Sequence, residues 1–243
     1  MSSRRTISTA RRVLAQLRHD PRTIALLLVV PAMLMTLLSW ILDDANWQRY
    51  APGLLGIFPM LVMFLVTSVA TLRERTGGTL ERLLSMPMSK ADFVFGYALA
   101  FGVIAAVQGI IVGGLCFTVL GLSMQGPTSL VLMVAVLDGL LGTAMGLFVS
   151  AFAQTEFQAV QFMPVALLPQ FLLCGLIVPT DQLPSILRFI SALLPLTYAF
   201  AAMQKLAQNA TVASEFWVDV VVLIGMAAGL LAAGTATLRR RTA

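Results

Sequence analysis

Six runs of apolar residues, each close to the length that crosses a bilayer, constrain this chain more than any other feature. A hydrocarbon core about 30 Å thick takes about 20 helical residues. Within it, only helices and closed barrels satisfy their own backbone hydrogen bonds. The predicted membrane spans are residues 24–42, 53–72, 93–120, 129–152, 157–178 and 216–238. We therefore expect an all-α polytopic membrane protein, with one transmembrane domain over residues 1–243.

The composition excludes an ordinary soluble domain. Hydrophobic residues make up 58% of the chain and charged residues only 11%, whereas soluble domains carry about 25% charged residues. A net charge of +5 could favour nucleic acid, but the basic residues cluster beside the ends of apolar runs. We expect no nucleic-acid partner. His19 is the only histidine, and the two cysteines lie inside apolar runs, so we predict no metal site.

The distribution of lysine and arginine predicts the orientation. If the first residues lie inside, the inner segments hold thirteen of the sixteen basic residues, and the outer segments hold Arg49, Arg188 and Lys205. Positive charge favours the cytoplasmic side. We expect both termini in the cytoplasm, and a prokaryotic cell (inner) membrane as the location.

Residues 1–22 are predicted to form an amphipathic helix at the interface. Apolar residues recur at helical spacing against six arginines, which favours a helix lying on anionic lipid. The apolar residues are Ile7, Ala10, Leu14 and Leu17. A solvated tail is the alternative.

A short charged insert, residues 73–87, separates the second and third spans. Gly77-Gly78 interrupts the preceding helix, Thr79 can cap a new turn, and Pro87 ends it. One face of that turn would carry Leu80, Leu83 and Leu84. Ser89-x-x-Asp92 then resembles a capping box for the next helix. The pattern predicts a small amphipathic helix on the aqueous side, where a partner can push it.

Residues 179–215 are too short to be a span and too apolar to be a loop. An apolar stripe lies between Pro184 and Pro195, in a piece that cannot cross the bilayer. We expect short helices that dip into the outer side and return, acting as a lid on a pathway. A surface-lying hairpin with no gating role is the alternative.

Polar residues inside the spans have two interpretations. Asp138 lies near the middle of the fourth span, where a charge costs about 2.5–3.5 kcal/mol on insertion scales. It would line a route, or be a neutral acid hydrogen-bonded between helices. Pro164 and Pro169 would kink the fifth span, which also carries Gln158, Gln161 and Gln170. That helix would line a pathway, although polar packing between helices has the same pattern.

Glycine pairs four residues apart permit close helix approach. They occur at Gly109 and Gly113, at Gly142 and Gly146, and at Gly225 and Gly229. Each pair alone is weak support for dimerisation.

Three stretches together resemble the type-2 ABC exporter permeases. They are Glu74 to Pro87, Glu156 to Phe162 with Pro164 and Pro169 behind it, and Pro179-x-Asp181-x-x-Pro184 followed by Leu194 to Tyr198. The resemblance implies a coupling helix between the second and third spans, an interfacial connecting helix before the first span, and outer re-entrant helices between the fifth and sixth spans. The ATPase contact would be made by Glu74, Arg75, Thr79, Leu80, Glu81, Arg82, Leu83, Leu84 and Pro87. Candidate pathway residues are Asp138, Gln158, Gln161, Phe162, Pro164 and Gln170, and candidate outer-gate residues are Asp181, Pro184, Pro195 and Tyr198.

The expected function is that of a permease subunit in an ATP-driven exporter of an amphipathic or hydrophobic substrate, such as a drug, an antibiotic or a lipid-like compound. The sequence contains no phosphate-cradling G-x-x-x-x-G-K-[ST] loop and no catalytic constellation. ATP and Mg would therefore be used by a separate ABC ATPase, present in two copies. A second permease copy, identical or paralogous, and membrane lipid complete the expected partners. Two alternatives are a proton-coupled secondary transporter that uses Asp138 and a non-transporting membrane scaffold.

Overall fold

The computed structural model describes residues 3–77 and 89–237. Within these residues the chain is helical and has no strand, which confirms the all-α architecture. The helices are α1 (Ser3–Arg18), α2 (Pro21–Ile41), α3 (Asp44–Thr76), α5 (Lys90–Thr118), α6 (Thr128–Ser150), α7 (Glu156–Leu173), α8 (Ser185–Ala192), α9 (Pro195–Gln208) and α10 (Ser214–Thr237), with a 3-10 turn at Thr180–Gln182.

Five of the described helices, α2, α3, α5, α6 and α10, are long and apolar enough to cross a membrane. The pair α8 and α9 is bent by 88° and counts as a sixth candidate if it is one broken span. The polytopic membrane fold is therefore confirmed. Helix α7 covers most of the range expected for the fifth span, and its crossing of the bilayer stays a prediction.

Several helix boundaries follow from local side-chain chemistry. Asp20 and Asp43 accept backbone N–H groups in the first turns of α2 and α3. Ser89 and Asp92 form the predicted capping box at the start of α5. Each cap satisfies N–H groups that have no partner inside the helix. At the other end of α3, Gly77 follows the last helical residue, and its N–H is bonded to Arg73 O.

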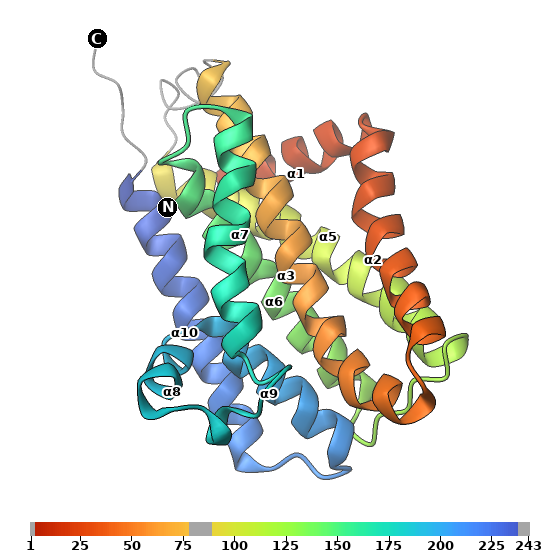
Figure 1. The fold of residues 1–243 in the computed structure, drawn as a ribbon. Coiled ribbons are helices and arrows are strands. Elements are labelled where there is room, and N and C mark those ends of the chain that lie inside the picture. The colour runs from red at the N-terminus through yellow and green to blue at the C-terminus, as the bar shows by residue number, and fades with distance from the viewer. Residues whose placement is uncertain (1–2, 78–88, 238–243) are drawn as a thin grey trace.

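The helices surround α3 and α6, which run side by side through the centre of the bundle (Figure 1). Two glycines of α6 allow this approach. A Cβ at Gly142 would lie 2.1 Å from Met60 O, and one at Gly146 would lie 2.6 Å from Phe64 O. The small-residue pair predicted from the sequence therefore serves packing within the chain. Gly225 and Gly229 of α10, in contrast, have no atom within 4 Å of an added Cβ.

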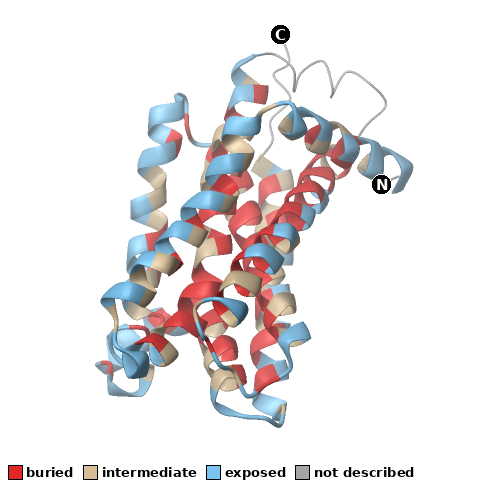
Figure 2. Cartoon of the chain, turned by 90° about the vertical axis from the view of Figure 1, so that its right-hand side faces the viewer, coloured by how far each residue is buried: buried red, intermediate tan, exposed pale blue. Residues whose placement is uncertain are grey.

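The two ends of the bundle, the insert end and the hairpin end, are formed by different elements. The insert end carries α1, residues 73–77 and residues 150–156, while the hairpin end carries α8, α9 and the start of α3 (Figure 1). Figure 2 shows that buried residues concentrate in the central helices. In its most apolar window α3 is 67% buried, whereas α2 is 17% buried and lies at the edge.

Helix α9 is a core element although it follows a short surface helix. Its buried side chains include Leu196, Phe200, Met203 and Leu206, and they join the main cluster with α3, α6 and α10. Lys205 of α9 forms an ion pair with Asp219 of α10 at 2.6 Å. The hairpin end is thus held from inside the bundle.

Candidate functional site

The candidate site is the polar junction at the insert end, formed by Arg73, Glu74 and Arg75 in the last turn of α3. These three residues begin the insert, residues 73–87, between the second and third expected spans. The other residues expected to contact an ATPase, Thr79, Leu80, Glu81, Arg82, Leu83, Leu84 and Pro87, lie outside the described residues.

Three consecutive helical residues point in directions about 100° apart, because an α-helix has 3.6 residues per turn. Here the side chains of these three residues contact three different helices. Arg73 binds Glu156 of α7 and Glu74 binds Arg12 of α1. Arg75 Nη1 donates to the carbonyl of Ser150, the last residue of α6. The base of the insert is therefore tied to α1, α6 and α7 at once.

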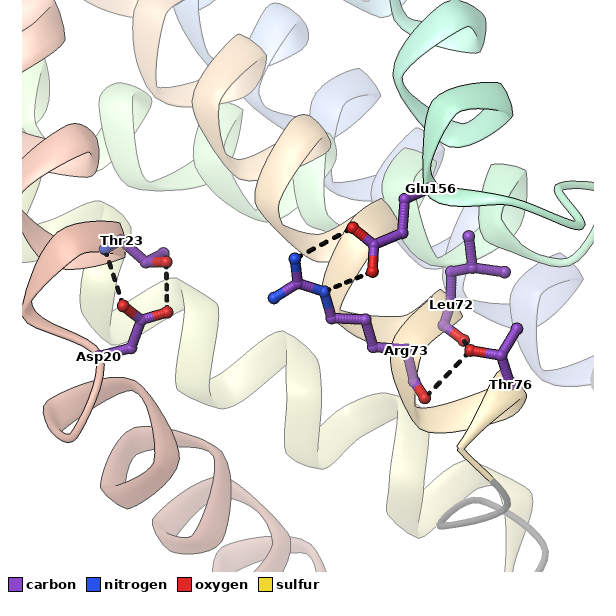
Figure 3. A network of polar contacts seen from close by, with 6 residues as sticks. All are labelled: Asp20, Thr23, Leu72, Arg73, Thr76 and Glu156. Carbon is purple, nitrogen blue, oxygen red and sulfur yellow. Dashed lines mark hydrogen bonds and ion pairs between the residues drawn. The ribbon is translucent and has the colours of Figure 1, made fainter.

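The contact between Arg73 and Glu156 is bidentate and exposed (Figure 3). Arg73 Nε and Nη2 lie 2.8 and 3.0 Å from the two carboxylate oxygens. With exposed fractions of 62% and 52%, solvent screens this pair, so it contributes to position more than to stability.

Asp20 lies near the same junction, at the start of α2 (Figure 3). It accepts hydrogen bonds from Thr23 Oγ1 at 2.6 Å and Thr23 N at 3.2 Å. These bonds, the side-chain one first, hold the pKa of Asp20 below its ordinary value. The cap therefore stabilises the folded protein at pH values above the ordinary pKa of a carboxyl group. This contribution is lost as the pH falls through the lowered pKa of Asp20.

The ion pair between Glu74 and Arg12 is more buried than the ion pair between Arg73 and Glu156. Arg12 Nη1 lies 2.9 Å from Glu74 Oε1, and the side chains are 26% and 10% exposed. Tyr97 of α5, which is buried, lies beside both. Nearby, α1 packs so closely on α5 that a Cβ added at Gly96 would lie 2.5 Å from Thr9 Cβ. The connection between α1 and the insert is thus set into the protein interior.

The candidate pathway residues do not form one cluster. Asp138 is fully buried, and neither carboxyl oxygen has a hydrogen-bond partner among the described residues. One of its oxygens is 2.9 Å from where a Cβ of Gly56 would stand. On α7, Gln158 and Gln170 are twelve residues apart, which is about 18 Å along a helix. Gln161 and Pro164 are exposed, and Phe162 packs beside the small cluster of Leu72, Ala153 and Ala159.

Two of the glutamines have local structural roles. Gln158 Oε1 accepts from Gln154 N at the start of α7. Gln170 Nε2 donates to Ala166 O at 2.9 Å, and its Oε1 accepts from Leu196 N at 3.4 Å. Leu196 lies in the first turn of α9, whose own N-cap residue, Leu194, supplies no side-chain bond. Gln170 therefore caps α9 from a neighbouring helix.

The candidate outer-gate residues all lie at the hairpin end. Pro184 precedes α8 and Pro195 begins α9. Tyr198 Oη donates to Ala192 O at 2.8 Å and so links α9 to the end of α8. Asp181 lies in the 3-10 turn before α8. Their part in gating stays a prediction.

Sequence reasoning assigned no partner to Arg12, Ser150 or Glu156. Arg12 and Glu74 are 62 residues apart, and Arg73 and Glu156 are 83 apart. Basic residues on the first amphipathic helix and an acid at the end of a span are complementary. That complementarity does not select one arginine among six.

The sequence matches a known family and several named proteins. Residues 5–207 match the profile of the ABC-2 type transporter family. The chain is 24% identical over 190 residues to the probable multidrug ABC transporter permease YbhS of Escherichia coli K12, covering 77% of this chain and 50% of that protein. It is 26% identical over 213 residues to the linearmycin resistance permease protein LnrN of Bacillus subtilis, covering 87% and 55%. It is also 25% identical over 176 residues to ABC transporter G family member 20 of Dictyostelium discoideum, covering 72% and 24%. The chain spans about half the length of the two bacterial relatives.

Proposed function

This chain belongs to the ABC-2 type transporter family as a membrane permease subunit, and on that premise we propose that it exports an amphipathic or hydrophobic compound with energy from a separate ATPase. The insert after α3 is the docking element for that ATPase. Binding of ATP and Mg by the partner moves the insert, and the polar junction passes the movement to the membrane helices.

The observation that carries the proposal is the three-way connection of Arg73, Glu74 and Arg75. A displacement of the insert acts first on the last turn of α3. From there it reaches α7 through Glu156, α1 through Arg12 and α6 through Ser150. A scaffold that only recruits a protein has no need for its docking segment to be tied to three helices.

The substrate class rests on two supports. The names of the bacterial relatives refer to multidrug transport and to linearmycin resistance. Within the described residues the interior is mostly apolar, with few buried charged groups. We propose a drug, an antibiotic or a lipid-like compound, moved by two permease copies and two ATPase copies in the prokaryotic cell membrane, with the insert end in the cytoplasm.

A pull-down tests this proposal. The tagged full chain is solubilised from its native membrane, and co-purifying proteins are identified beside a variant in which residues 80–84 are scrambled. We expect a stoichiometric soluble subunit bearing a G-x-x-x-x-G-K-[ST] loop with the native chain and its loss with the scrambled one. Recovery of the native chain without any ATPase, under conditions that preserve other complexes, would contradict the proposal.

One observation favours a second candidate, a proton-coupled transporter. Asp138 is a fully buried carboxyl without a hydrogen-bond partner among the described residues, and intramembrane acids often belong to proton routes. Transport by the purified chain in ATP-free vesicles under an imposed proton gradient, lost in Asp138→Asn, would support this function. Transport that needs ATP and the partner would exclude it.

A further inference from the structure

A cavity of about 290 Å³ lies at the hairpin end, between the first turns of α3, the segment after α7, and α9. Ligand pockets in proteins span about 300–1,000 Å³, so this one takes a small polar group and not a whole drug. Its polar lining includes Arg49, Asp181 and Gln204, and its apolar lining includes the buried Cys174, Leu176 and Phe200.

Hydrogen bonds hold the walls of this cavity in place. Gln204 Nε2 of α9 donates to Arg49 O of α3 at 2.9 Å. Arg188 Nη2 donates to the carbonyl of Asp181, which fixes the turn before α8. Gly175 has φ of 101°, a conformation that other residues rarely adopt, and it lets the chain turn along the lining. The cavity is therefore built before any ligand arrives.

The lining holds two exposed residues of opposite charge, Arg49 and Asp181. Neither the Arg49 guanidinium nor the Asp181 carboxylate forms an ion pair within residues 3–77 and 89–237. The guanidinium instead lies 5.5 Å from the centre of the Tyr50 ring. No group of three potential metal ligands exists in the described part of the chain, which disfavours a cation site. Two unpaired charges of opposite sign match a ligand that carries both.

The depth of the cavity points to the head-group layer. Tryptophan and tyrosine gather where a membrane meets water. The two exposed tryptophans lie at the hairpin end, with Trp40 in the last turn of α2 and Trp217 in the first turn of α10. Beside the cavity, α8 exposes apolar side chains, namely Ile186, Phe189 and Ile190. An apolar helix beside a charged cavity is suited to the boundary between acyl chains and head groups.

We propose that this cavity binds a zwitterionic group made of a phosphate and a primary ammonium. The phosphate accepts hydrogen bonds from Arg49, and the ammonium donates to Asp181, both as charge-assisted contacts. The source is the head group of phosphatidylethanolamine in the adjoining leaflet or free phosphoethanolamine. The site is separate from the polar junction and does not depend on transport.

Native mass spectrometry of the full chain in detergent tests the proposal with three probes. These are phosphatidylethanolamine, phosphatidylglycerol with the same acyl chains, and free phosphoethanolamine. We expect phosphatidylethanolamine to bind about tenfold more tightly than phosphatidylglycerol, since one added ion pair in a partly enclosed site has about that effect. Free phosphoethanolamine that binds as tightly as phosphatidylethanolamine would assign the site to the solute, and binding weaker by about tenfold or more would assign it to the lipid.

Matched variants separate the two contacts. Arg49→Gln should weaken binding of both lipids about tenfold, while Arg49→Lys keeps the charge and retains binding. Asp181→Asn should remove the preference for phosphatidylethanolamine. Asp44→Asn, an exposed acid at the same end outside the cavity, should change nothing. Equal binding of both lipids by the native chain would overturn the proposal. So would unchanged phosphatidylethanolamine binding in Arg49→Gln and Asp181→Asn variants whose thermal unfolding is native.

Discussion

At the scale of single residues, the absence of a side chain matters as much as its presence. Gly142 lies so close to α3 that an added Cβ would stand 2.1 Å from Met60 O and 2.8 Å from Met60 C. Backbone atoms cannot yield as a flexible side chain does. The spacing of α3 and α6 is therefore fixed by a missing methyl group.

Gly142→Ala should lower the free energy of unfolding by about 1–3 kcal/mol, because α6 has to move away from α3. The matched control is Gly229→Ala, where no atom lies within 4 Å. Better helix propensity makes that change neutral or stabilising by up to about 1 kcal/mol. Thermal unfolding in detergent measures both. Equal stability of the two variants would contradict the packing described above.

The ion pair between Arg12 and Glu74 gives a second prediction at this scale. Glu74→Ala leaves a partly buried guanidinium without its carboxylate, which should cost about 1–3 kcal/mol, between the values for exposed and buried pairs. Arg73→Ala breaks the exposed pair with Glu156 and should cost less than about 1 kcal/mol. Thermal unfolding and a double-mutant cycle with Arg12→Ala measure the coupling. Strict additivity of Arg12→Ala and Glu74→Ala would show that the pair contributes nothing.

At the scale of elements, α9 depends on help from α7. Its first turn has no capping side chain of its own, and Gln170 supplies the acceptor for Leu196 N. Ser191 and Thr197 add a link across the corner between α8 and α9, with oxygens 3.1 Å apart. The hairpin is thus a unit fastened to the end of α7.

Gln170→Leu should destabilise the hairpin by about 1 kcal/mol, the usual effect of losing a cap. Hydrogen exchange should rise in α9 before it rises elsewhere. Gln161→Leu on the exposed side of the same helix is the control and should leave exchange in α9 unchanged. Native hydrogen-exchange rates in α9 of the Gln170→Leu variant would show that Gln170 does not stabilise α9 as a cap.

At the scale of the whole molecule, the two ends of the bundle make different sets of contacts. At the insert end the last turn of α3 contacts α1, α6 and α7, whereas at the hairpin end α9 packs against α3, α6 and α10. The central pair of α3 and α6 runs between them. A movement at one end has a continuous packed route to the other.

Glu81→Lys and Leu84→Asp should lower transport-linked ATPase activity about tenfold or more, because each changes the character of the proposed docking face. Insertion into the membrane should remain normal, since neither residue lies in an expected span. ATPase activity of the reconstituted complex and membrane content of the chain are the two measurements. Normal export by both variants would disprove the coupling assignment.

Local sequence patterns predicted much of the architecture. Hydrophobic runs predicted a polytopic helical membrane protein, and short-range chemistry predicted the capping box at Ser89 and the end of α3 at Gly77. Such signals are encoded within a few residues, because hydrogen-bond satisfaction and burial act along the helix itself.

Only the tertiary structure decided which distant groups meet. It paired Arg12 with Glu74 and Arg73 with Glu156. It placed Gln170 where its side chain caps the first turn of α9. It also buried Asp138 without a hydrogen-bond partner in the described part of the chain. Gly142 and Gly229 have the same sequence pattern, yet one contacts a backbone and the other meets open space. The sequence by itself determined that helices form and cross a membrane. Partner choice depends on how those helices rotate and pack, a property of the whole fold that no local pattern contains.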